Sequence, residues 1–253
     1  MDSNRHFKSE YIVIKSDKMG ESNRLLSLLT PELGILRATA FGALKSKGKL
    51  HGYTSHLAYG SGDLYHDPVK GFWKLSSVDG GETFVNIGTN LKAYFAGCVM
   101  AEIYPHLFWN ETDGPYFFDL MKQSLYCLND CSEKDVDYIL IQYLWRLLVV
   151  LGFAPDFEHC CKTGVPLDGE TSIYYQKSYN GFTSAELSDS RHLMIHRGVI
   201  KYLKYTYDLS LEKSLKVTLS DQDISTLKSI LIAHIQNEIN YSLKTIKMSS
   251  GIL

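Results

Sequence analysis

The chain lacks the features that mark secreted, membrane-spanning and disordered proteins. No apolar run reaches the roughly 18 residues that a membrane-spanning helix needs, and charged residues interrupt the start of the chain, where a signal peptide would lie. Of the 253 residues, 45% are hydrophobic and only 21% are charged, which is enough apolar material for a packed core. We therefore expect a folded cytoplasmic protein with no membrane segment.

Cysteine is scarce, and its pattern excludes a disulfide framework. There are five cysteines, an odd number at irregular spacing, and a reducing compartment would keep them as thiols. We expect them to behave mainly as small buried hydrophobic residues. They are Cys98, Cys127, Cys131, Cys160 and Cys161.

Signatures of catalysis are missing as well. The sequence has no Walker loop, no Gly-x-Gly-x-x-Gly after a strand and no His-Glu-x-x-His pair, and its acidic residues are scattered singly. A nucleophile at Cys160 or Cys161 would need a shaped cleft, and the adjacent His159 points elsewhere on a regular backbone. We expect a protein that is not an enzyme. The alternative, an active site in the irregular stretch 153–189, predicts lost activity in Cys160→Ser.

An excess of positive charge is also absent from the chain as a whole, which carries a formal charge of −2. Residues 1–80 nevertheless hold eleven Lys and Arg against eight Asp and Glu, a net charge of +3, and the remainder carries −5. No acidic residue lies between Glu32 and Asp63. We therefore expect any phosphate-binding site to lie in this window.

The first 80 residues predict a small β-barrel. Short runs rich in β-branched, aromatic and leucine residues alternate with Gly, Pro, Asn and Asp. A turn at Pro31 to Gly34 and a bulge at Gly60 and Gly62 would suit a closed sheet. A five-stranded oligonucleotide-binding (OB) barrel is the leading candidate. The five predicted strands are Tyr11 to Lys15, Arg24 to Thr30, Ile35 to Phe41, Leu57 to Tyr65 and Phe72 to Val78.

From about Asn90 the hydrophobic period becomes helical. The expected fold class is therefore α+β, with an OB domain over residues 1–80 and a mainly helical domain over 81–253. Ser132 with Asp135, and Ser220 with Asp223, have the spacing of capping boxes, and Gly152 suits a left-handed helix end. The predicted helices are Leu91 to Ile103, Pro115 to Leu128, one that starts at Ser132 and has its apolar run from Tyr138 to Leu151, one from after Asp189 to about Asp208, and Ser220 to about Tyr241.

One segment carries a resemblance to a known family. Gly20 to Gly42, GESNRLLSLLTPELGILRATAFG, resembles the N-terminal signature of the RecO family of bacterial recombination mediators. The likeness continues through ALKSKGKLHG at Ala43 to Gly52, and more weakly through LGFAPDF at Leu151 to Phe157 and LKT at Leu243 to Thr245. It spans nearly the whole chain, although its specific part is the first 52 residues.

The resemblance implies a non-catalytic mediator of DNA repair. Such a protein binds single- and double-stranded DNA, anneals complementary strands, and works with RecR in the RecFOR pathway to load RecA onto DNA coated with single-strand-binding protein. Its place would be the cytoplasm, in association with the nucleoid. The implied DNA contacts are Arg24, Arg37, Lys45, Lys47 and Lys49.

The chemistry of these residues suits a polyphosphate. Arginine forks onto phosphate oxygens, and lysine supplies a point charge on a flexible stem, so contacts of this kind follow a backbone without selecting a sequence. Arg24 has an alternative role, pairing with Glu21 or Asp17 as part of the barrel. Five aromatic residues offer stacking surfaces, although residues of this type in strands more often belong to a core. They are Tyr53, Tyr59, Tyr65, Phe72 and Trp73.

A zinc ribbon that many family members carry is degenerate here. Zinc needs four thiolate or imidazole donors in a tetrahedron, yet only Cys160 stands at a ligand position. Thr163 stands where a second cysteine would precede Gly164, and Ser184 and Leu187 stand where a distal pair would fall. We expect no zinc and no other cofactor, and a degenerate ribbon-like insertion over 153–189.

The helical half offers a candidate partner site. Arg197, Lys201 and Lys204 form a basic stripe on one helix face, beside Tyr202 and Tyr205. Family resemblance implies that this half binds the acidic tail of single-strand-binding protein, and such a stripe would suit it. An OB protein that binds structured RNA during RNA maturation remains the alternative function, which competition between single-stranded DNA and RNA would separate.

Overall fold

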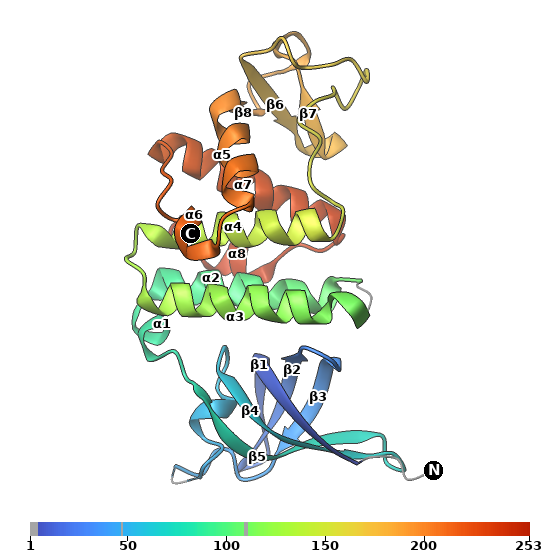
Figure 1. The fold of residues 1–253 in the computed structure, drawn as a ribbon, viewed down its shortest axis with the longest axis vertical. Coiled ribbons are helices and arrows are strands. Elements are labelled where there is room, and N and C mark those ends of the chain that lie inside the picture. The colour runs from blue at the N-terminus through green and yellow to red at the C-terminus, as the bar shows by residue number, and fades with distance from the viewer. Residues whose placement is uncertain (1–4, 47, 109–110) are drawn as a thin grey trace. The chain divides into compact units, whose positions relative to one another are not determined.

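The computed structural model describes residues 5–46, 48–108 and 111–253 (Figure 1). Lys47, one of the predicted DNA contacts, lies outside the described residues. Contacts divide the chain into two compact units, residues 1–130 and 131–253. The boundary that we place after residue 80 lies near the end of the last barrel strand, and the first unit continues through three further helices.

Unit 1 begins with a closed five-stranded barrel in the order β1-β2-β3-β5-β4, which confirms the predicted OB architecture. Only the β3–β5 pair is parallel, and β4 returns to β1 to close the sheet. All five predicted runs form strands. They are β1 (His6–Met19), β2 (Asn23–Thr30), β3 (Gly34–Ala40), β4 (Tyr59–Asp67) and β5 (Phe72–Glu82).

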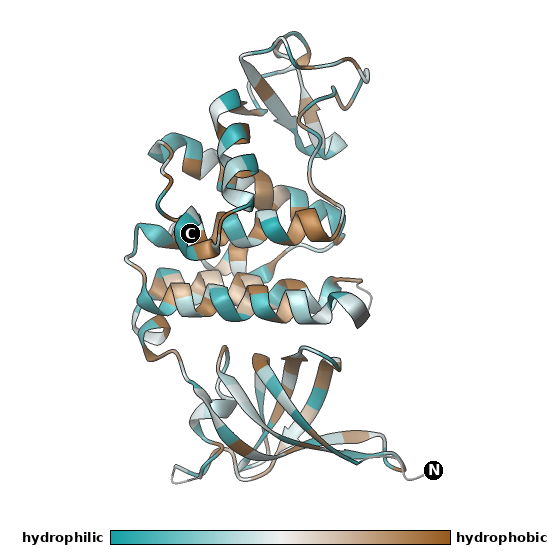
Figure 2. Cartoon of the chain, viewed as in Figure 1, coloured by the Kyte–Doolittle hydropathy of each residue, from teal (hydrophilic) through white to brown (hydrophobic). Residues whose placement is uncertain are grey.

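Apolar and polar residues interchange along the barrel strands (Figure 2). The apolar side chains fill the barrel interior. Leu26, Leu28, Leu36 and Ala38 point inward, together with residues of the other strands. The predicted bulge is present, because the β4–β5 register shifts between Ser61 and Gly62. A Cβ at Gly62 would lie 2.1 Å from the Ser77 carbonyl oxygen, so this close approach admits only glycine.

Three helices complete unit 1: α1 (Val85–Thr89), α2 (Leu91–Ile103) and α3 (Gly114–Asp130). Helix α2 contacts β1, and α3 contacts β2, so both helices pack on the barrel. On the outer side of the barrel, Lys122 Nζ of α3 donates to Glu10 Oε1 at 2.6 Å and lies 3.0 Å from Tyr59 Oη. This group of three polar side chains joins α3 to β1 and β4.

Unit 2 is built around α4, as its long apolar run predicts. Helix α4 contacts α5, α6 and α7, and most of its residues are buried. Gly152 follows it with a φ of +75°, which confirms the predicted left-handed end. The Ser132 hydroxyl donates to the Asp135 carboxylate at 2.7 Å, and Ser220 caps α7. The helices are α4 (Asp135–Val150), α5 (Arg197–Tyr207), α6 (Leu211–Ser214), α7 (Asp221–Glu238) and α8 (Lys244–Met248).

The stretch that sequence patterns left irregular contains a small antiparallel sheet in the order β7-β6-β8. Its strands are β6 (Ser172–Gln176), β7 (Gly181–Thr183) and β8 (Leu193–His196). Phe157 and Phe182 pack together at a ring separation of 5.1 Å and form part of its core. Because β8 runs to His196, the helix expected from residue 190 begins only at Arg197.

Over the described ranges, no helix is both long and apolar enough to cross a membrane.

Candidate nucleic-acid interface

The strand register brings cationic residues together on the outer face of the barrel. Leu36 and Ala38 point inward, so Arg37 between them points outward and is exposed. Arg37 lies opposite Ser27 of β2, and Ser27 lies opposite Lys15 of β1. Lys15 and Arg37 therefore flank one row across three strands, at the face of β2 and β3 on which OB barrels bind oligonucleotides.

The next row on this face adds a cation and aromatic rings. Lys74 of β5 lies beside Thr39 of β3 and opposite Tyr65 of β4. The Lys74 ammonium lies 5.8 Å from the centre of the Phe41 ring, and Phe41 is 49% exposed although it is apolar. An exposed ring beside a lysine can stack on a base while the lysine reaches a neighbouring phosphate.

Hydrogen bonds hold the described residues of the basic loop after β3, 42–46 and 48–49. Gly42 has a φ of +70°, and its N–H donates to Asn23 Oδ1 at 2.9 Å. Within the loop, Lys45 N–H donates to Gly42 O at 3.1 Å, and Gly48 N–H donates to Lys45 O at 2.8 Å. These turns leave the side chains of Lys45 and Lys49 exposed. Lys45 and Lys49 are therefore presented by backbone that is already held by hydrogen bonds.

Carboxylates do not neutralise this cluster. Among the described residues, no salt bridge involves Arg37, Lys45 or Lys49. Lys15 does pair with Asp17 at 2.8 Å, so its charge is partly compensated. Phosphate can therefore reach three cations that pair with none of the described carboxylates.

Arg24 has a different environment. Its Nη1 donates to the Thr54 carbonyl at 2.8 Å and to Ser16 Oγ at 3.0 Å. These bonds tie β2 to β1 and to the short turn Gly52–Thr54. Asp17, the pairing alternative, instead contacts Lys15. Part of the Arg24 guanidinium is thus committed to the barrel itself.

The aromatic residues separate into two groups. Trp73 packs against the barrel core and stacks on His66 at 4.4 Å between ring centres, and Tyr59 lies under Lys122 at 4.3 Å. Both rings are therefore occupied within unit 1. Tyr65 is partly exposed on the outer face beside Lys74.

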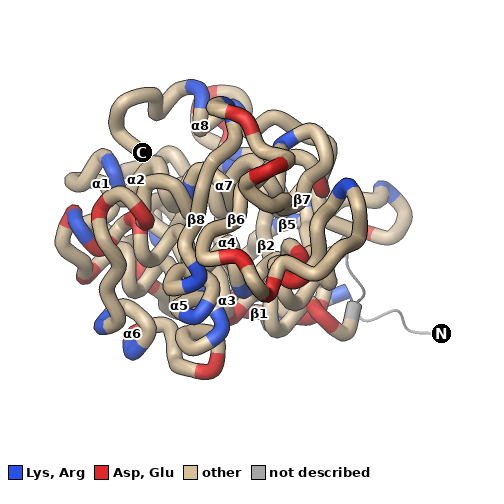
Figure 3. The backbone as a smooth tube through the Cα atoms, turned by 90° about the horizontal axis from the view of Figure 1, so that it is seen from above, with Lys and Arg blue, Asp and Glu red and all other residues tan. Residues whose placement is uncertain are grey.

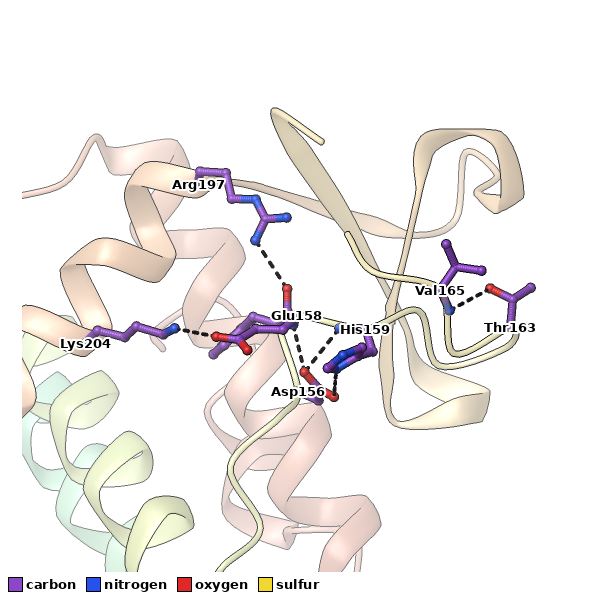
Figure 4. Close-up of polar contacts among 8 residues, drawn as sticks. Asp156, Glu158, His159, Thr163, Val165, Arg197 and Lys204 are labelled. Atoms are coloured by element: carbon purple, nitrogen blue, oxygen red, sulfur yellow. Dashed lines mark hydrogen bonds and ion pairs between the residues drawn. The ribbon is translucent and has the colours of Figure 1, made fainter. Parts of the chain in front are cut away.

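Helix α5 carries several Lys and Arg positions, drawn in blue in Figure 3. Two members of its basic stripe are engaged in contacts within unit 2 (Figure 4). Arg197 donates from Nε to the Glu170 carbonyl at 3.0 Å and from Nη1 to the Phe157 carbonyl at 3.3 Å, and Nη2 bonds the Leu167 carbonyl. Lys204 pairs with Glu158 at 2.9 Å. Figure 4 shows both side chains pointing toward the segment that contains Glu158.

Lys201, the third member of the stripe, forms no side-chain hydrogen bond or salt bridge to another described residue. It is exposed and lines a depression of about 520 Å³ together with Arg197, His159 and Asp168. Tyr205 is 62% exposed, whereas Tyr202 is buried and hydrogen-bonded to Gln142. The stripe therefore offers less free charge than its spacing indicates.

The segment after α4, in which the sequence predicts a degenerate zinc ribbon, forms a tight turn that ends at Gly164. Gly164 N–H donates to Cys160 O at 2.8 Å, with Gly164 at a φ of +68°, and Cys160 Sγ contacts Thr183 Oγ1 at 3.3 Å. Burial alone would raise the pKa of the Cys160 thiol, but hydrogen bonds from Thr163, Thr183 and two backbone amides lower it to about 6. Neutral hydroxyls are poor zinc donors.

The side chains around Cys160 therefore do not provide the ligands that a zinc site needs. Within residues 5–46, 48–108 and 111–253, no three His, Cys, Asp or Glu side chains are grouped so that they could hold a metal ion. The residues present do not fit zinc.

Comparison with known proteins agrees with the barrel and the helices. The family model described as "Recombination protein O N terminal" matches residues 1–84, and "Recombination protein O C terminal" matches residues 88–246. The chain belongs to the RecO family. RecO proteins are DNA repair proteins by name, and recombination and DNA binding are consistent with the family.

Curated RecO relatives match over most of their length. DNA repair protein RecO of Dehalococcoides mccartyi (strain CBDB1) is 25% identical over 91% of this chain and 89% of its own. The protein of the same name from Clostridium perfringens (strain 13 / Type A) is 25% identical over 93% of this chain and 95% of its own. DNA repair protein RecO of Bacillus velezensis (strain DSM 23117 / BGSC 10A6 / LMG 26770 / FZB42) is 31% identical over 69% of this chain and 66% of its own.

Sequence reasoning missed three residues of this RecO barrel face: Lys15, Phe41 and Lys74. Their positions follow from register, and β1 has a register irregularity between Val13 and Lys15. Simple alternation along β1 therefore gives the wrong face beyond that point. For Phe41 and Lys74 the signal was weak, because a parallel β3–β5 contact joins strands far apart in sequence.

Proposed function

We propose that the outer face of β2 and β3, with the loop Gly42–Lys49, holds the backbone of single- and double-stranded DNA without sequence preference. The observation that carries the proposal is the exposure of Arg37, Lys45 and Lys49 with no salt bridge to a described carboxylate. Phosphate binding by such cations releases counterions and depends steeply on salt. Phe41 and Tyr65 add stacking surfaces for unpaired bases.

The protein acts, in this proposal, as a recombination mediator. Bound strands are annealed, and with RecR the protein promotes loading of RecA onto DNA that single-strand-binding protein covers. Membership in the RecO family supports this role. The activity needs no bond-making chemistry, so no catalytic group is assigned.

We also propose that the tail of single-strand-binding protein binds α5, at Lys201 and the depression that this side chain lines. An acidic peptide would be attracted to Lys201 and could compete with Glu158 for Lys204. Arg197 would contribute mainly by holding the surface in place, because its guanidinium already bonds three carbonyls. Charge reversal at Lys201 is expected to weaken binding of the tail peptide, and unchanged binding would contradict this placement.

The protein also works without zinc in this proposal. Thr163, Thr183 and backbone amides surround Cys160 where zinc ligands would be needed. Metal analysis of the purified protein is expected to find less than stoichiometric zinc. One zinc ion per chain would overturn this part.

The central experiment is strand annealing at several salt concentrations. A variant with Lys45, Lys47 and Lys49 changed to Ala is compared with the natural protein. We expect weaker DNA binding and a logarithmic salt slope reduced by about 0.7 to 0.9 for each phosphate contact removed. A matched control changes three exposed lysines of unit 2, Lys213, Lys216 and Lys247, to Ala.

The control removes the same charge but leaves the barrel intact, so equal loss in both variants would indicate a general charge effect. An unchanged salt slope in the loop variant would refute the proposed interface. Competition between single-stranded DNA and RNA addresses the RNA-binding alternative, which the family match does not favour. Stronger competition by RNA than by single-stranded DNA would favour the RNA-binding function over the DNA-binding one.

A further inference from the structure

A polar pocket in unit 2 lies outside every site discussed so far. It has a volume of about 700 Å³ and lies between the short turn Lys177–Tyr179 and the end of α7. No aspartate or glutamate is among its described lining residues. Among the residues that line it are Lys177, Tyr179, Asn180, Gln236, Asn240 and Ser242.

Hydrogen bonds fix the turn to α7. Asn180, at a φ of +47°, accepts from Tyr175 Oη at 2.6 Å and from Asn237 Nδ2 at 3.1 Å, and its own amide donates to Glu238. Asn237 Nδ2 also donates to the Lys177 carbonyl at 2.8 Å. The backbone that carries Tyr179 is therefore held before any ligand arrives.

Several groups at the pocket keep unused binding capacity. The Tyr179 ring is 58% exposed, with Lys162 Nζ 5.3 Å from its centre. Gln236 Oε1 accepts from Leu243 N–H at 2.8 Å, which fixes the orientation of its amide and leaves the Nε2 hydrogens available. The side chains of Asn240 and Ser242 form no hydrogen bond to another described residue.

We propose that this pocket is a second site for single-stranded nucleic acid, at which one unstacked nucleotide lies on Tyr179. The amides of Gln236 and Asn240 face the base edge, and Lys177 and Lys162 attract the flanking phosphates. The proposal rests on the proposed DNA-binding function and deepens it, because annealing requires a second strand to be held as well as the first.

Chemistry favours a single strand over the other ligands. The Asn240 amide offers a donor and an acceptor side by side, and Gln236 adds its Nε2 donor; such groups match the edges of nucleobases. In a duplex the base edges are paired and the base faces are stacked on one another. The edges could therefore not bond the amides, and the faces could not stack on Tyr179. An acidic peptide could use Lys177 and Lys162 and could bond the amides through its main chain, but its carboxylates offer no flat face to stack on the exposed ring of Tyr179.

The experiment uses the full chain and a short fluorescent oligothymidylate, with stoichiometry measured by titration. Three variants are compared with the natural protein: the pocket variant Lys177→Ala with Tyr179→Ala, the barrel variant Arg37→Ala with Lys45→Ala and Lys49→Ala, and both sets combined. We expect two oligonucleotides per natural chain, one for each single-site variant and none for the combination. Loss of Tyr179 is expected to weaken the second binding step about tenfold.

A control variant, Tyr205→Ala with Lys213→Ala, removes an equally exposed tyrosine and lysine from unit 2 and is expected to retain both sites. Far-UV circular dichroism and the melting temperature establish that each variant is folded. As an independent readout, oligonucleotides that carry 5-iodouracil are expected to cross-link to Tyr179 on irradiation.

The outcomes separate the two proposals. If the pocket variant still binds two oligonucleotides, or if the natural protein binds only one, the second site is refuted. If the barrel variant retains two while the pocket variant retains one, the barrel assignment fails and the pocket stands. Displacement of the pocket-bound strand by an acidic peptide at equal concentration would assign the pocket to peptide binding instead and overturn the inference.

Discussion

The barrel and helix α5 carry similar sets of cations that the fold uses differently. On the barrel, Arg37 and Lys45 project from hydrogen-bonded backbone and have no described acidic partner. On α5, Arg197 bonds three carbonyls and Lys204 pairs with Glu158. Basic residues at regular spacing therefore do not by themselves indicate a binding surface, because the folded backbone can take up the same donors.

The strongest test of this comparison is Arg197→Ala. The substitution removes charge-assisted hydrogen bonds to the carbonyls of Phe157, Leu167 and Glu170, so we expect unfolding free energy to fall by about 2 to 4 kcal/mol. Urea denaturation followed by circular dichroism measures the change. Arg191→Ala is the control, because among the described residues the Arg191 guanidinium pairs only with Asp189, at the surface, and its loss should have little effect. Equal stability of the two variants would show that Arg197 contributes no more to the fold than an exposed arginine does.

Arg24→Ala tests the barrel residue that shares the behaviour of Arg197. Loss of the bonds to Thr54 and Ser16 is expected to lower unfolding free energy by about 1 to 2 kcal/mol. DNA affinity measured by fluorescence anisotropy is expected to fall less than in Arg37→Ala. The reverse order of affinities would mean that Arg24 is mainly a phosphate ligand.

Lys122→Met tests an engaged lysine through the pH dependence of stability. Burial raises the pKa of Glu10, but hydrogen bonds from Lys122 and Tyr59 outweigh it and hold the pKa below its ordinary value of 4.5. The carboxylate therefore stabilises the fold above that value, and the contribution is lost as pH falls through the lowered pKa. We expect roughly 0.5 to 1 kcal/mol of acid-sensitive stability in the natural protein, which solvent screening keeps small.

Thermal unfolding at a series of pH values measures this contribution. The variant should be less stable near neutral pH and should lose less stability than the natural protein below about pH 4.5. Parallel curves for both proteins would show that Lys122 does not act on Glu10.

The smallest stability effect is expected for Arg37→Ala. An exposed side chain with no described hydrogen bond contributes little to folding, so the change should stay within about 0.5 kcal/mol. Its DNA binding should nevertheless weaken, with a lower salt slope. A large loss of stability would place Arg37 with Arg197 among the structural cations.

Sequence patterns predicted the elements whose stabilising contacts are local. The short run from Ile35 to Phe41, rich in β-branched, aromatic and leucine residues, located β3, and the spacing of Ser220 and Asp223 located the start of α7. The sheet β6–β8 was missed because its strands are only three to five residues long. Contacts that are distant in sequence, such as Phe157 with Phe182, determine that sheet.

The candidate site was predictable only in part, for a related reason. Arg37 and Lys45 could be identified from the acid-free window and the resemblance of the first 52 residues. Lys74 joins them through the parallel β3–β5 pairing, and the register irregularity near Val13 turns Lys15 to the same face. Which cations are free was not predictable, because the carbonyls that bind Arg197 come from residues 27 to 40 positions earlier.

The bonds of Arg197 have an evolutionary consequence. They end on main-chain oxygens, which every amino acid possesses, and not on particular side chains. The residues at positions 167 and 170 can therefore be exchanged over generations while this attachment of the insertion to α5 persists. Such an anchor would allow the inserted segment to diverge quickly without detaching from the helix that supports it.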